Sequence, residues 1–258
     1  MNERIIMHVD VNSAYLSWEA AYRMQHGEMR DLRAIPSVVG GDEKSRHGIV
    51  LAKSIPAKKY DIHTGEALLS VRQKCPGIII VPPRYPLYMQ CHNALMDLLR
   101  EYSPRIQVFS IDECFLDYTG MEALHGDPFE AAVRIKNRIR EELGFTVNIG
   151  ISTNKLLAKM AGELEKPDKV CTIFPWEIPN KMWPLKVDEL YMVGRATAPK
   201  LYRLNIFTIG ELAATDPQLL QYHFKSFGKI LKDYSNGIEN SPVAPECGPP
   251  IKGIGNST

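Results

Sequence analysis

The sequence predicts an α+β protein whose main layer carries an inserted subdomain and is followed by a small helical unit. Residues 1–13 and 84–173 alternate short apolar strand patterns with amphipathic helix patterns, which is typical of a mixed layer. After Lys166-Pro167 the pattern changes to short helices separated by prolines, and this change predicts a separate helical unit. With 258 residues, the chain is long enough for more than one core.

The first two elements are a strand and a helix. Residues 4–10 (RIIMHVD) form an apolar run with an acidic end, which predicts a buried strand. Residues 12–26 then carry Tyr15 and Trp18 at helical spacing, and Gly27 is a typical helix stop.

Two short apolar runs follow, SVV at 37–39 and IVLAK at 49–53, and the polar segment between them predicts a hairpin. That segment begins GGDE at 40–43, the letters that open the signature of diguanylate cyclases. In a cyclase, Phe and an apolar strand normally follow, whereas polar KSRHG follows here. The two glycines supply the backbone freedom of a turn, so Asp42 and Glu43 are expected to be solvated loop acids.

The remaining elements of the main layer follow from similar patterns. Helix starts are marked by proline or a capping side chain, and helix ends by glycine. The expected elements are a strand at 78–81, a helix at 86–102, two strands within 105–119 that meet at Ser110–Asp112, a helix from Asp127 to Gly144, a strand at 146–152, and a helix capped by Ser152 or Thr153.

Three acidic residues lie where apolar strands end or meet. Asp10 closes the first strand, and Asp112 and Glu113 lie between the apolar halves of FSIDECF. A carboxylate there is costly to desolvate unless it meets a cation, and together the three would provide oxygen ligands for Mg²⁺. The alternative is that Asp10 caps the following helix and the other two form a polar turn. Neighbours in a regular strand point to opposite faces, so both can serve one site only if the strand bends.

Three sequence blocks, taken together, carry a resemblance to a known family. HVDVNSAYLSWE (8–19), FSIDECFLD (109–117) and GISTNKLLAKMAGELEKP (150–167) are similar, in order and spacing, to the motifs of Y-family DNA polymerases, the DinB/UmuC (ImpB/MucB/SamB-type) translesion enzymes. The resemblance covers essentially the whole chain and implies a right-hand polymerase core without the little-finger domain. Its expected parts are a palm at 1–13 and 84–173, fingers at 14–83, a thumb at 174–240, and a linker with the start of a truncated little finger at 241–258.

The resemblance implies a metal site on the three acids. Asp10, Asp112 and Glu113 match the family's metal-binding carboxylates, and Val11 matches the residue whose carbonyl also reaches the metal. Two Mg²⁺ ions about 3.5–4 Å apart can activate a primer 3′-hydroxyl and stabilise the leaving phosphate oxygen. The implied activity is template-directed transfer of a nucleotide from a dNTP to a primer, in DNA repair, damage tolerance and the SOS response.

Other matched positions concern the incoming sugar and base. Tyr15 matches the steric gate, an aromatic ring that excludes the 2′-hydroxyl of a ribonucleotide; without the motif it would be a plain core tyrosine. Ile49 and Leu51 match the residues that roof the nascent base pair, although as strand residues they could equally be core.

A further set is expected to hold the triphosphate. Lys166, in EKP, matches the family's triphosphate lysine, and Lys58 and Ser54 lie in the fingers stretch that grips the same group. Many members have a Tyr and an Arg there, spaced YxxR, whereas this chain has Ile55 and Lys58. A lysine keeps the positive charge but not the bidentate fork of arginine, and it is more similar to the UmuC side of the family.

Three basic residues near these motifs have open roles. His8 shares the strand face of Asp10 and is expected to be structural rather than a proton carrier. Lys155 and Lys159 are either solvated helix charges or additional contacts to DNA or phosphate.

The segment at 187–206 (VDELYMVGRATAPKLYRLNI) resembles a helix-hairpin-helix, a module whose backbone amides grip DNA phosphates. Its expected contacts are Gly194, Arg195 and Thr197, while Met192 replaces a glycine of the usual turn. The alternative is a plain helical pair. Contacts of this kind position a duplex without reading its sequence.

Bulk composition is compatible with these expectations. Lys+Arg 31 against Asp+Glu 30 gives a net charge of +1, which does not exclude a local basic groove for DNA. Five scattered cysteines favour free thiols in a reducing compartment, and no apolar run has the length of a membrane span. We therefore expect a cytoplasmic monomer that binds primer-template DNA and dNTP, with any sliding clamp recruited through parts outside this chain.

Two other functions remain open at this level. A DNA-binding accessory protein could keep the polymerase fold without its chemistry, but it should lack some of the three carboxylates. A nucleotide cyclase is suggested by GGDE alone, and that hypothesis leaves SIDE, the EKP lysine and the hairpin segment without a role.

Overall fold

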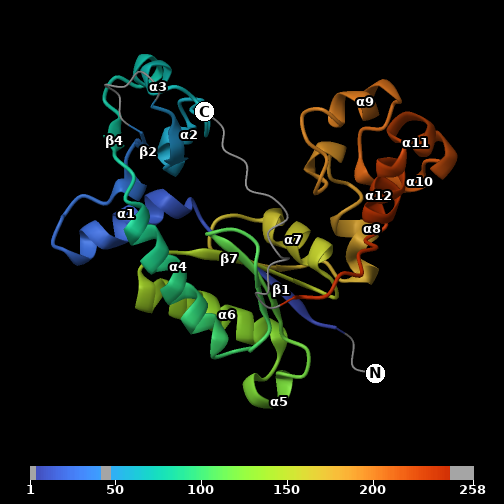
Figure 1. Cartoon of the computed structure of the whole chain (residues 1–258), viewed down its shortest axis with the longest axis horizontal. Helices are drawn as coiled ribbons and strands as arrows, with labels where there is room; N and C mark the ends of the chain where they lie inside the picture. The colour runs from blue at the N-terminus through green and yellow to red at the C-terminus, as the bar shows by residue number, and fades with distance from the viewer. Residues whose placement is uncertain (1–3, 42–47, 245–258) are drawn as a thin grey trace, which may run out of the picture.

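The computed structural model describes residues 4–41 and 48–244, and its centre is a five-stranded mixed sheet (Figure 1). The strand order is β5-β6-β1-β7-β8. The central strand β1 (Ile6–Val11) runs antiparallel to β6 (Glu113–Asp117) and to β7 (Val147–Ser152). The edges are β5 (Ile106–Val108), antiparallel to β6, and β8 (Val170–Thr172), parallel to β7. The α+β prediction is thus confirmed, although the short, half-buried β8 was not predicted.

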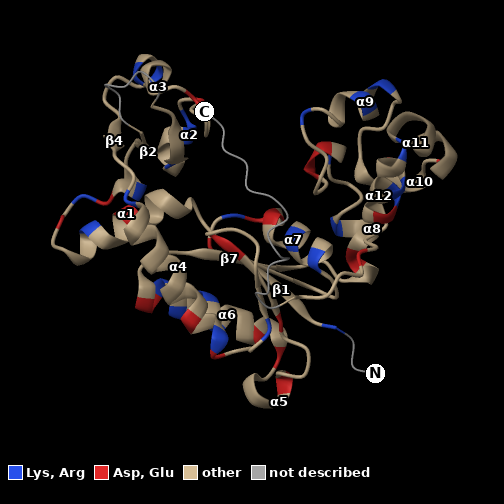
Figure 2. Cartoon of the chain, in the orientation of Figure 1, with Lys and Arg blue, Asp and Glu red and all other residues tan. Residues whose placement is uncertain are grey.

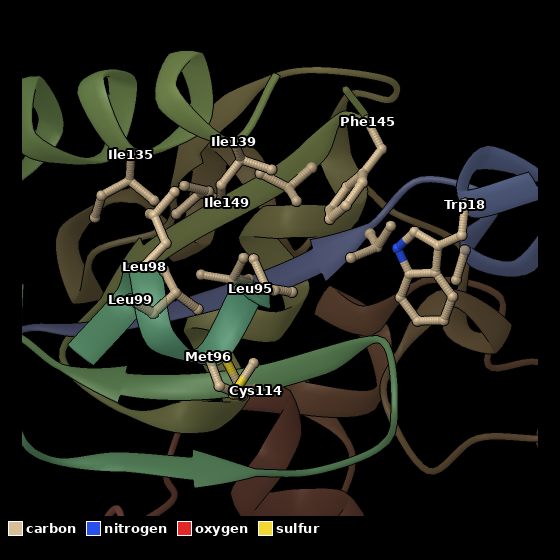
Figure 3. Packing of buried hydrophobic residues seen from close by; sticks show 14 of the residues in the cluster. Trp18, Leu95, Met96, Leu98, Leu99, Cys114, Ile135, Ile139, Phe145 and Ile149 are labelled. Atoms are coloured by element: carbon tan, nitrogen blue, oxygen red, sulfur yellow. The ribbon is translucent and has the colours of Figure 1, made fainter. Parts of the chain in front are cut away.

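One face of this sheet is covered by α4 (Tyr85–Arg100) and α6 (Pro128–Arg138). The side chains of Met7 and Val9 lie on this face because residues in a strand alternate between faces. Figure 3 shows how residues of both helices pack on those of the sheet. The packed residues include Leu95, Leu98 and Leu99 of α4, Ile135 of α6, and Cys114 and Ile149 of the sheet.

The opposite face of the sheet is covered by α7 (Lys155–Leu164). The cap of α7 is Asn154, whose side-chain oxygen accepts a hydrogen bond from the Leu157 amide at 2.9 Å. The predicted caps were therefore wrong: Ser152 ends β7, and its hydroxyl donates to the Ile173 carbonyl at 2.5 Å. A cap must be the last residue before the helix, and Asn154 holds that place with extended backbone.

The helix that contains α6 begins and ends at the residues that the sequence predicts. Asp127 caps α6 by accepting hydrogen bonds from the next two free amides, and a π-helical turn, Ile139–Leu143, extends the helix. Gly144 ends it with a φ of +80°, which an L side chain rarely adopts. A short helix, α5 (Glu122–His125), precedes this unit.

A three-stranded sheet forms an inserted lobe, defined here as residues 35–81. Its order is β3-β2-β4, with the predicted hairpin of β2 (Ser37–Gly40) and β3 (Val50–Lys53) and a parallel β4 (Ile79–Val81). Two helices, α2 (Ile55–Lys58) and α3 (Leu68–Lys74), complete the lobe, and a 3₁₀ turn, Leu32–Ala34, precedes it. Asp42 and Glu43 of GGDE lie outside the described residues.

The helix α1 (Ala14–Gln25) connects β1 to this lobe, but its apolar side packs into the core of the central sheet. Trp18 is fully buried there, with its ring 5.8 Å from that of Tyr88 and 6.2 Å from that of Phe145. Gly27 follows the helix with a φ of +88°, as a helix stop should.

The chain after β8 forms a helical lobe, defined here as residues 174–237, on the other side of the central sheet from the inserted lobe (Figure 1). Prolines start several of its helices, where a missing N–H costs nothing. Its elements are the 3₁₀ turns Pro175–Glu177 and Val187–Glu189 and the helices α8 (Ile178–Lys181), α9 (Ala198–Arg203), α10 (Ile209–Ala214), α11 (Pro217–Phe224) and α12 (Ser226–Ser235). None of the helices in the described residues is both long and apolar enough to cross a membrane.

Candidate active site

The three predicted acids gather at one end of the central sheet. Asp10 and Glu113 are direct partners in the β1–β6 register, so their side chains share the α7 face. Asp112 precedes β6 in the turn after β5, where its carbonyl accepts a hydrogen bond from the Val11 amide at 3.0 Å. The turn provides the bend that neighbouring acids need to serve one site. Asp10 does not cap α1, because Ser13 holds the cap position and no side chain bonds there.

The close approach of α7 to the sheet depends on two glycines. A Cβ on Gly150 would lie 1.9 Å from the Ala158 carbonyl oxygen and 2.3 Å from the Gly162 amide nitrogen. Helix and strand can therefore meet only where both lack a side chain. Because α7 lies this close, its Lys159 reaches Glu113 on β6, and Lys166, in the segment after α7, reaches Asp10 on β1.

Each of the acids has a protein partner in this structure. The Lys166 ammonium lies 2.7 Å from Oδ2 of Asp10, and the Ser110 hydroxyl donates to Oδ1 of Asp112 at 2.6 Å. Oε2 of Glu113 accepts from His8 Nε2 at 2.9 Å and from the Lys159 ammonium. Within the described ranges, no three carboxylate, histidine or cysteine groups are already converged to hold a cation. Three carboxylates at one end of the sheet are nevertheless a donor set that fits the oxygen preference of Mg²⁺.

Burial and charge act on these acids in opposite directions. Burial raises the pKa of Asp10 above its ordinary value, although the Lys166 ammonium opposes the shift. Burial also opposes ionisation of Glu113, but hydrogen bonds from His8 and Lys159 prevail and lower its pKa to about 2. Burial would lower the pKa of Lys166, yet Asp10 and Glu163 raise it. Burial thus disfavours the charged forms of Asp10, Glu113 and Lys166, and in each case oppositely charged neighbours act against that effect.

A cavity of about 380 Å³ opens beside Asp10 and Asp112 and extends beneath the inserted lobe. Tyr15 and Leu51, predicted for the sugar and the base pair, line it together with Lys58. The Tyr15 ring stacks on Tyr88, with ring centroids 4.6 Å apart and an interplanar angle of 13°, which fixes its orientation. The structure therefore brings together an acidic end, an aromatic wall and a basic residue.

A second cavity of about 270 Å³ shares Asp10 and Lys58 with the first and adds Ile55 and Lys166. The two predicted triphosphate lysines, one from the inserted lobe and one from the segment after α7, thus border one space. A triphosphate is the kind of anion that two converging ammonium groups can hold.

Glu113 lies beside Asp10 but lines neither cavity, and two predicted residues of the inserted lobe are not brought into this site. Ser54 is buried, and its hydroxyl donates to the Ile35 carbonyl and accepts from the Ser37 and Ala57 amides, so it caps α2. Every hydrogen-bonding position of the hydroxyl is used in these contacts, so the structure leaves none free for the predicted triphosphate. Ile49 is 44% exposed, pairs with Ala67 and does not line either cavity.

The sequence missed two other residues of the cavity wall. Lys53 and Thr64 line the larger cavity, and Lys53 donates to the Ile62 carbonyl at 2.5 Å. Burial and the charge of Lys58 lower the pKa of Lys53. A signal for Lys53 was present, because it lies two residues after Leu51 and thus on the same face of β3.

The predicted hairpin lies in the helical lobe, away from the cavities. The Gly194 carbonyl accepts from the Thr197 and Ala198 amides and begins α9, and Arg195 is exposed. Met192, at the position of the missing glycine, has a φ of +76°, the region that glycine favours. The turn therefore keeps its backbone form without the glycine. Figure 2 shows only lysine and arginine among the charged residues of α9, whereas α4, α6 and α7 carry charges of both signs.

The fold and the site define a class, that of the Y-family polymerase cores. DinB from Sulfolobus solfataricus superposes with a TM-score of 0.80 at 27% identity, over 93% of this chain and 69% of that one. An insertion ternary complex of the Dbh DNA polymerase matches with the same TM-score, identity and coverage. The fold of this chain is thus similar to that of a DinB protein, although Lys58 is more similar to the UmuC side of the family.

The model of the impB/mucB/samB family matches residues 9–163, and the chain belongs to that family. It is 54% identical to a DNA polymerase IV of Clostridium acetobutylicum over 99% of its length and 38% identical to DNA polymerase IV 1 of Bacillus subtilis. The chain spans 64% and 60% of those two proteins, somewhat less than two thirds of each.

Proposed function

We propose that this chain is the catalytic core of a template-directed DNA polymerase of the translesion type. The observation that carries the proposal is the meeting of Asp10 and Asp112 with Tyr15 in one cavity between the central sheet and the inserted lobe. Relatives named DNA polymerase IV, and the ternary complex of a structural neighbour, support it. The reaction joins the primer 3′-hydroxyl to the α-phosphate of a dNTP and releases pyrophosphate.

In this proposal Asp10, Asp112, Glu113 and the Val11 carbonyl hold two Mg²⁺ ions. When bound, these ions neutralise the triphosphate and lower the cost of deprotonating the primer hydroxyl. The protein's own contribution is to place the carboxylates rigidly at the sheet end and to exclude water under the inserted lobe. Positioning and charge compensation of this kind supply most of the catalysis of phosphoryl-type transfer.

The nucleotide is held by residues of three elements. Lys58 and Lys166 bind the triphosphate from two sides, and Tyr15 contacts the sugar where a 2′-hydroxyl would collide with its ring. Leu51, with Ile49 beyond the cavity, covers the base. The central sheet then acts as the palm, the inserted lobe as the fingers and the helical lobe as the thumb, where Gly194, Arg195 and Thr197 contact the DNA backbone.

Its substrates would be primer-template DNA and dNTP, in the cytoplasm, with the chain acting as a monomer. Recruitment by a sliding clamp would use parts outside this chain. The DNA contact would be to phosphates through local lysines and arginines such as those of α9, although the net charge of the chain is only +1.

Primer extension on templated DNA with Mg²⁺ tests the function. The Asp112→Asn variant keeps the shape of the side chain but not its charge, and it should lose at least about 100-fold in rate. Asp97→Asn is the control, because Asp97 is exposed and forms a salt bridge with the neighbouring Arg100 on α4. Equal rates for the parent and Asp112→Asn would exclude the carboxylate assignment.

The same assay separates the two other hypotheses. An accessory protein would extend no primer, yet the presence of all three acids on one sheet end argues against it. A cyclase would convert GTP without template or primer, and product analysis would detect the cyclic dinucleotide.

A further inference from the structure

His8 is a fully buried polar residue that has no role in the proposed reaction as described above. Its exposure is 0%, its ring packs on Phe115 at a centroid distance of 4.8 Å, and its Nε2 lies 2.9 Å from Oε2 of Glu113. Its second nitrogen, Nδ1, has no hydrogen-bond partner anywhere in residues 4–41 and 48–244. A buried unpaired nitrogen calls for a physical explanation.

The neighbours of His8 determine which nitrogen carries its proton. The Lys159 ammonium donates to the same Oε2 of Glu113, so this oxygen belongs to an ionised carboxylate that accepts from both sides. Nε2 of His8 must then be the donor. Nδ1 faces Gly162, where an added Cβ would lie 3.4 Å from it.

This arrangement is costly if it serves packing alone. A buried polar atom without a partner costs about 1–3 kcal/mol, and an apolar side chain of similar size would avoid that cost. The benefit must therefore come from the other nitrogen, through its hydrogen bond to Glu113. Groups that orient a metal-binding side chain have this form in many metal sites.

We propose that His8 is a positioning residue for Glu113. Together with Lys159 it holds Oε2, so that Oε1, which accepts no hydrogen bond from the described residues, is left for a cation. The side chain of Glu113 is thereby fixed before the cation arrives. The inference rests on the proposed function, because it takes Glu113 as a cation ligand.

Two substitutions separate positioning from packing. His8→Leu fills the same space without a donor, and His8→Gln restores an N–H donor on a side chain of similar length. Met7→Leu is the matched control, since Met7 is a fully buried neighbour on β1 whose side chain lies on the opposite face.

The measurements are Mn²⁺ affinity by electron paramagnetic resonance, with primer-template and a non-hydrolysable dNTP analogue, and the kcat and KM of primer extension. We expect His8→Leu to weaken Mn²⁺ binding and to lower kcat by about 10–100-fold, with less than about a threefold change in the KM for dNTP. His8→Gln and Met7→Leu should stay within about threefold of the parent in both.

The outcomes distinguish this inference from the proposed function. A parent chain that extends no primer contradicts the function, while the Mn²⁺ affinities still test His8. An active parent with a folded His8→Leu variant of equal affinity and rate overturns the positioning role alone. Equal impairment of His8→Gln and His8→Leu also overturns it, because packing would then explain the loss.

A measurement on the parent keeps the inference testable if His8→Leu does not fold. Nitrogen-15 NMR of labelled histidine should show His8 as the tautomer with the proton on Nε2. This signal should shift in Glu113→Gln. A proton on Nδ1 in the parent would overturn the inference.

Discussion

The Lys166 ammonium lies 2.7 Å from Oδ2 of Asp10, although the two residues are 156 positions apart in the chain. The same ammonium is 2.8 Å from Oε1 of Glu163, so it compensates one half-buried and one exposed carboxylate. Lys166 also borders the cavity that it shares with Lys58. If a cation bound Asp10 and a phosphate bound Lys166, the ion pair between these two residues would be replaced by one between Asp10 and the cation and one between Lys166 and the phosphate. Binding of either ligand would therefore free the residue that the other ligand needs.

Lys166→Met should lower kcat/KM for dNTP in primer extension by about 10–100-fold, because one charge-assisted contact to the triphosphate is lost. The loss should appear mainly in KM if the contact forms already in the bound ground state. Lys169→Met is the control, since Lys169 is exposed and lies 4.0 Å from its partner Glu165. Unchanged kinetics for Lys166→Met would remove Lys166 from the triphosphate site.

Tyr15→Ala should raise the incorporation of ribonucleotides relative to deoxyribonucleotides by at least about tenfold, because the ring that would meet a 2′-hydroxyl is absent. Tyr15→Phe keeps the ring on Tyr88 and should keep the selectivity of the parent. Competition between ATP and dATP on one template measures both. A parent-like ratio in Tyr15→Ala would show that another group selects the sugar.

Gly150→Ala should destabilise the protein by about 1–3 kcal/mol or more, because its Cβ would lie 1.9 Å from the Ala158 carbonyl oxygen. Relief of this contact requires α7 to move away from the sheet, so primer extension should fall as well. Urea unfolding of Gly77→Ala provides the comparison, since an added Cβ there meets nothing within 4 Å. Equal unfolding midpoints for the two variants would contradict the close approach of α7.

Glu66 should make the inserted lobe sensitive to acid. Hydrogen bonds from Lys74, from Ser70 and from the His63 amide lower the pKa of Glu66 to about 2. The pKa of a glutamate carboxyl in the unfolded chain is 4.5, so the lowered pKa of Glu66 stabilises the folded state at pH values above 4.5. This stabilisation is lost as the pH falls from about 4.5 to 2.

Glu66→Gln should therefore be less stable than the parent at neutral pH, and the difference in free energy of unfolding should shrink through that interval. Chemical unfolding at several pH values measures it, with the exposed Asp97→Asn as reference. A difference that stays constant down to pH 2 would show that Glu66 gains nothing from its charge.

Much of the fold was predictable because its signals lie in contiguous residues. The apolar run in RIIMHVD, the Asp127 cap and the glycines after helices each depend on a few neighbours, and the structure has the expected elements at these places. Local patterns did not predict the cap of α7, because several neighbouring polar residues can serve as a cap. They also did not predict β8, because three residues are too few to show a strand pattern.

The candidate site was predictable in its residues but not in its contacts. Motif order and spacing identified the family and pointed to Asp10, Asp112 and Glu113, because these are properties of the chain itself. Only the tertiary structure decided that the Ser54 hydroxyl bonds to Ile35 and Ser37 and that His8 and Lys159 share one oxygen of Glu113. The contacts of Lys159 with Glu113 and of Lys166 with Asp10 join residues 46 and 156 positions apart. Their formation depends on how closely α7 packs on the sheet, a distance that no local pattern in the sequence encodes.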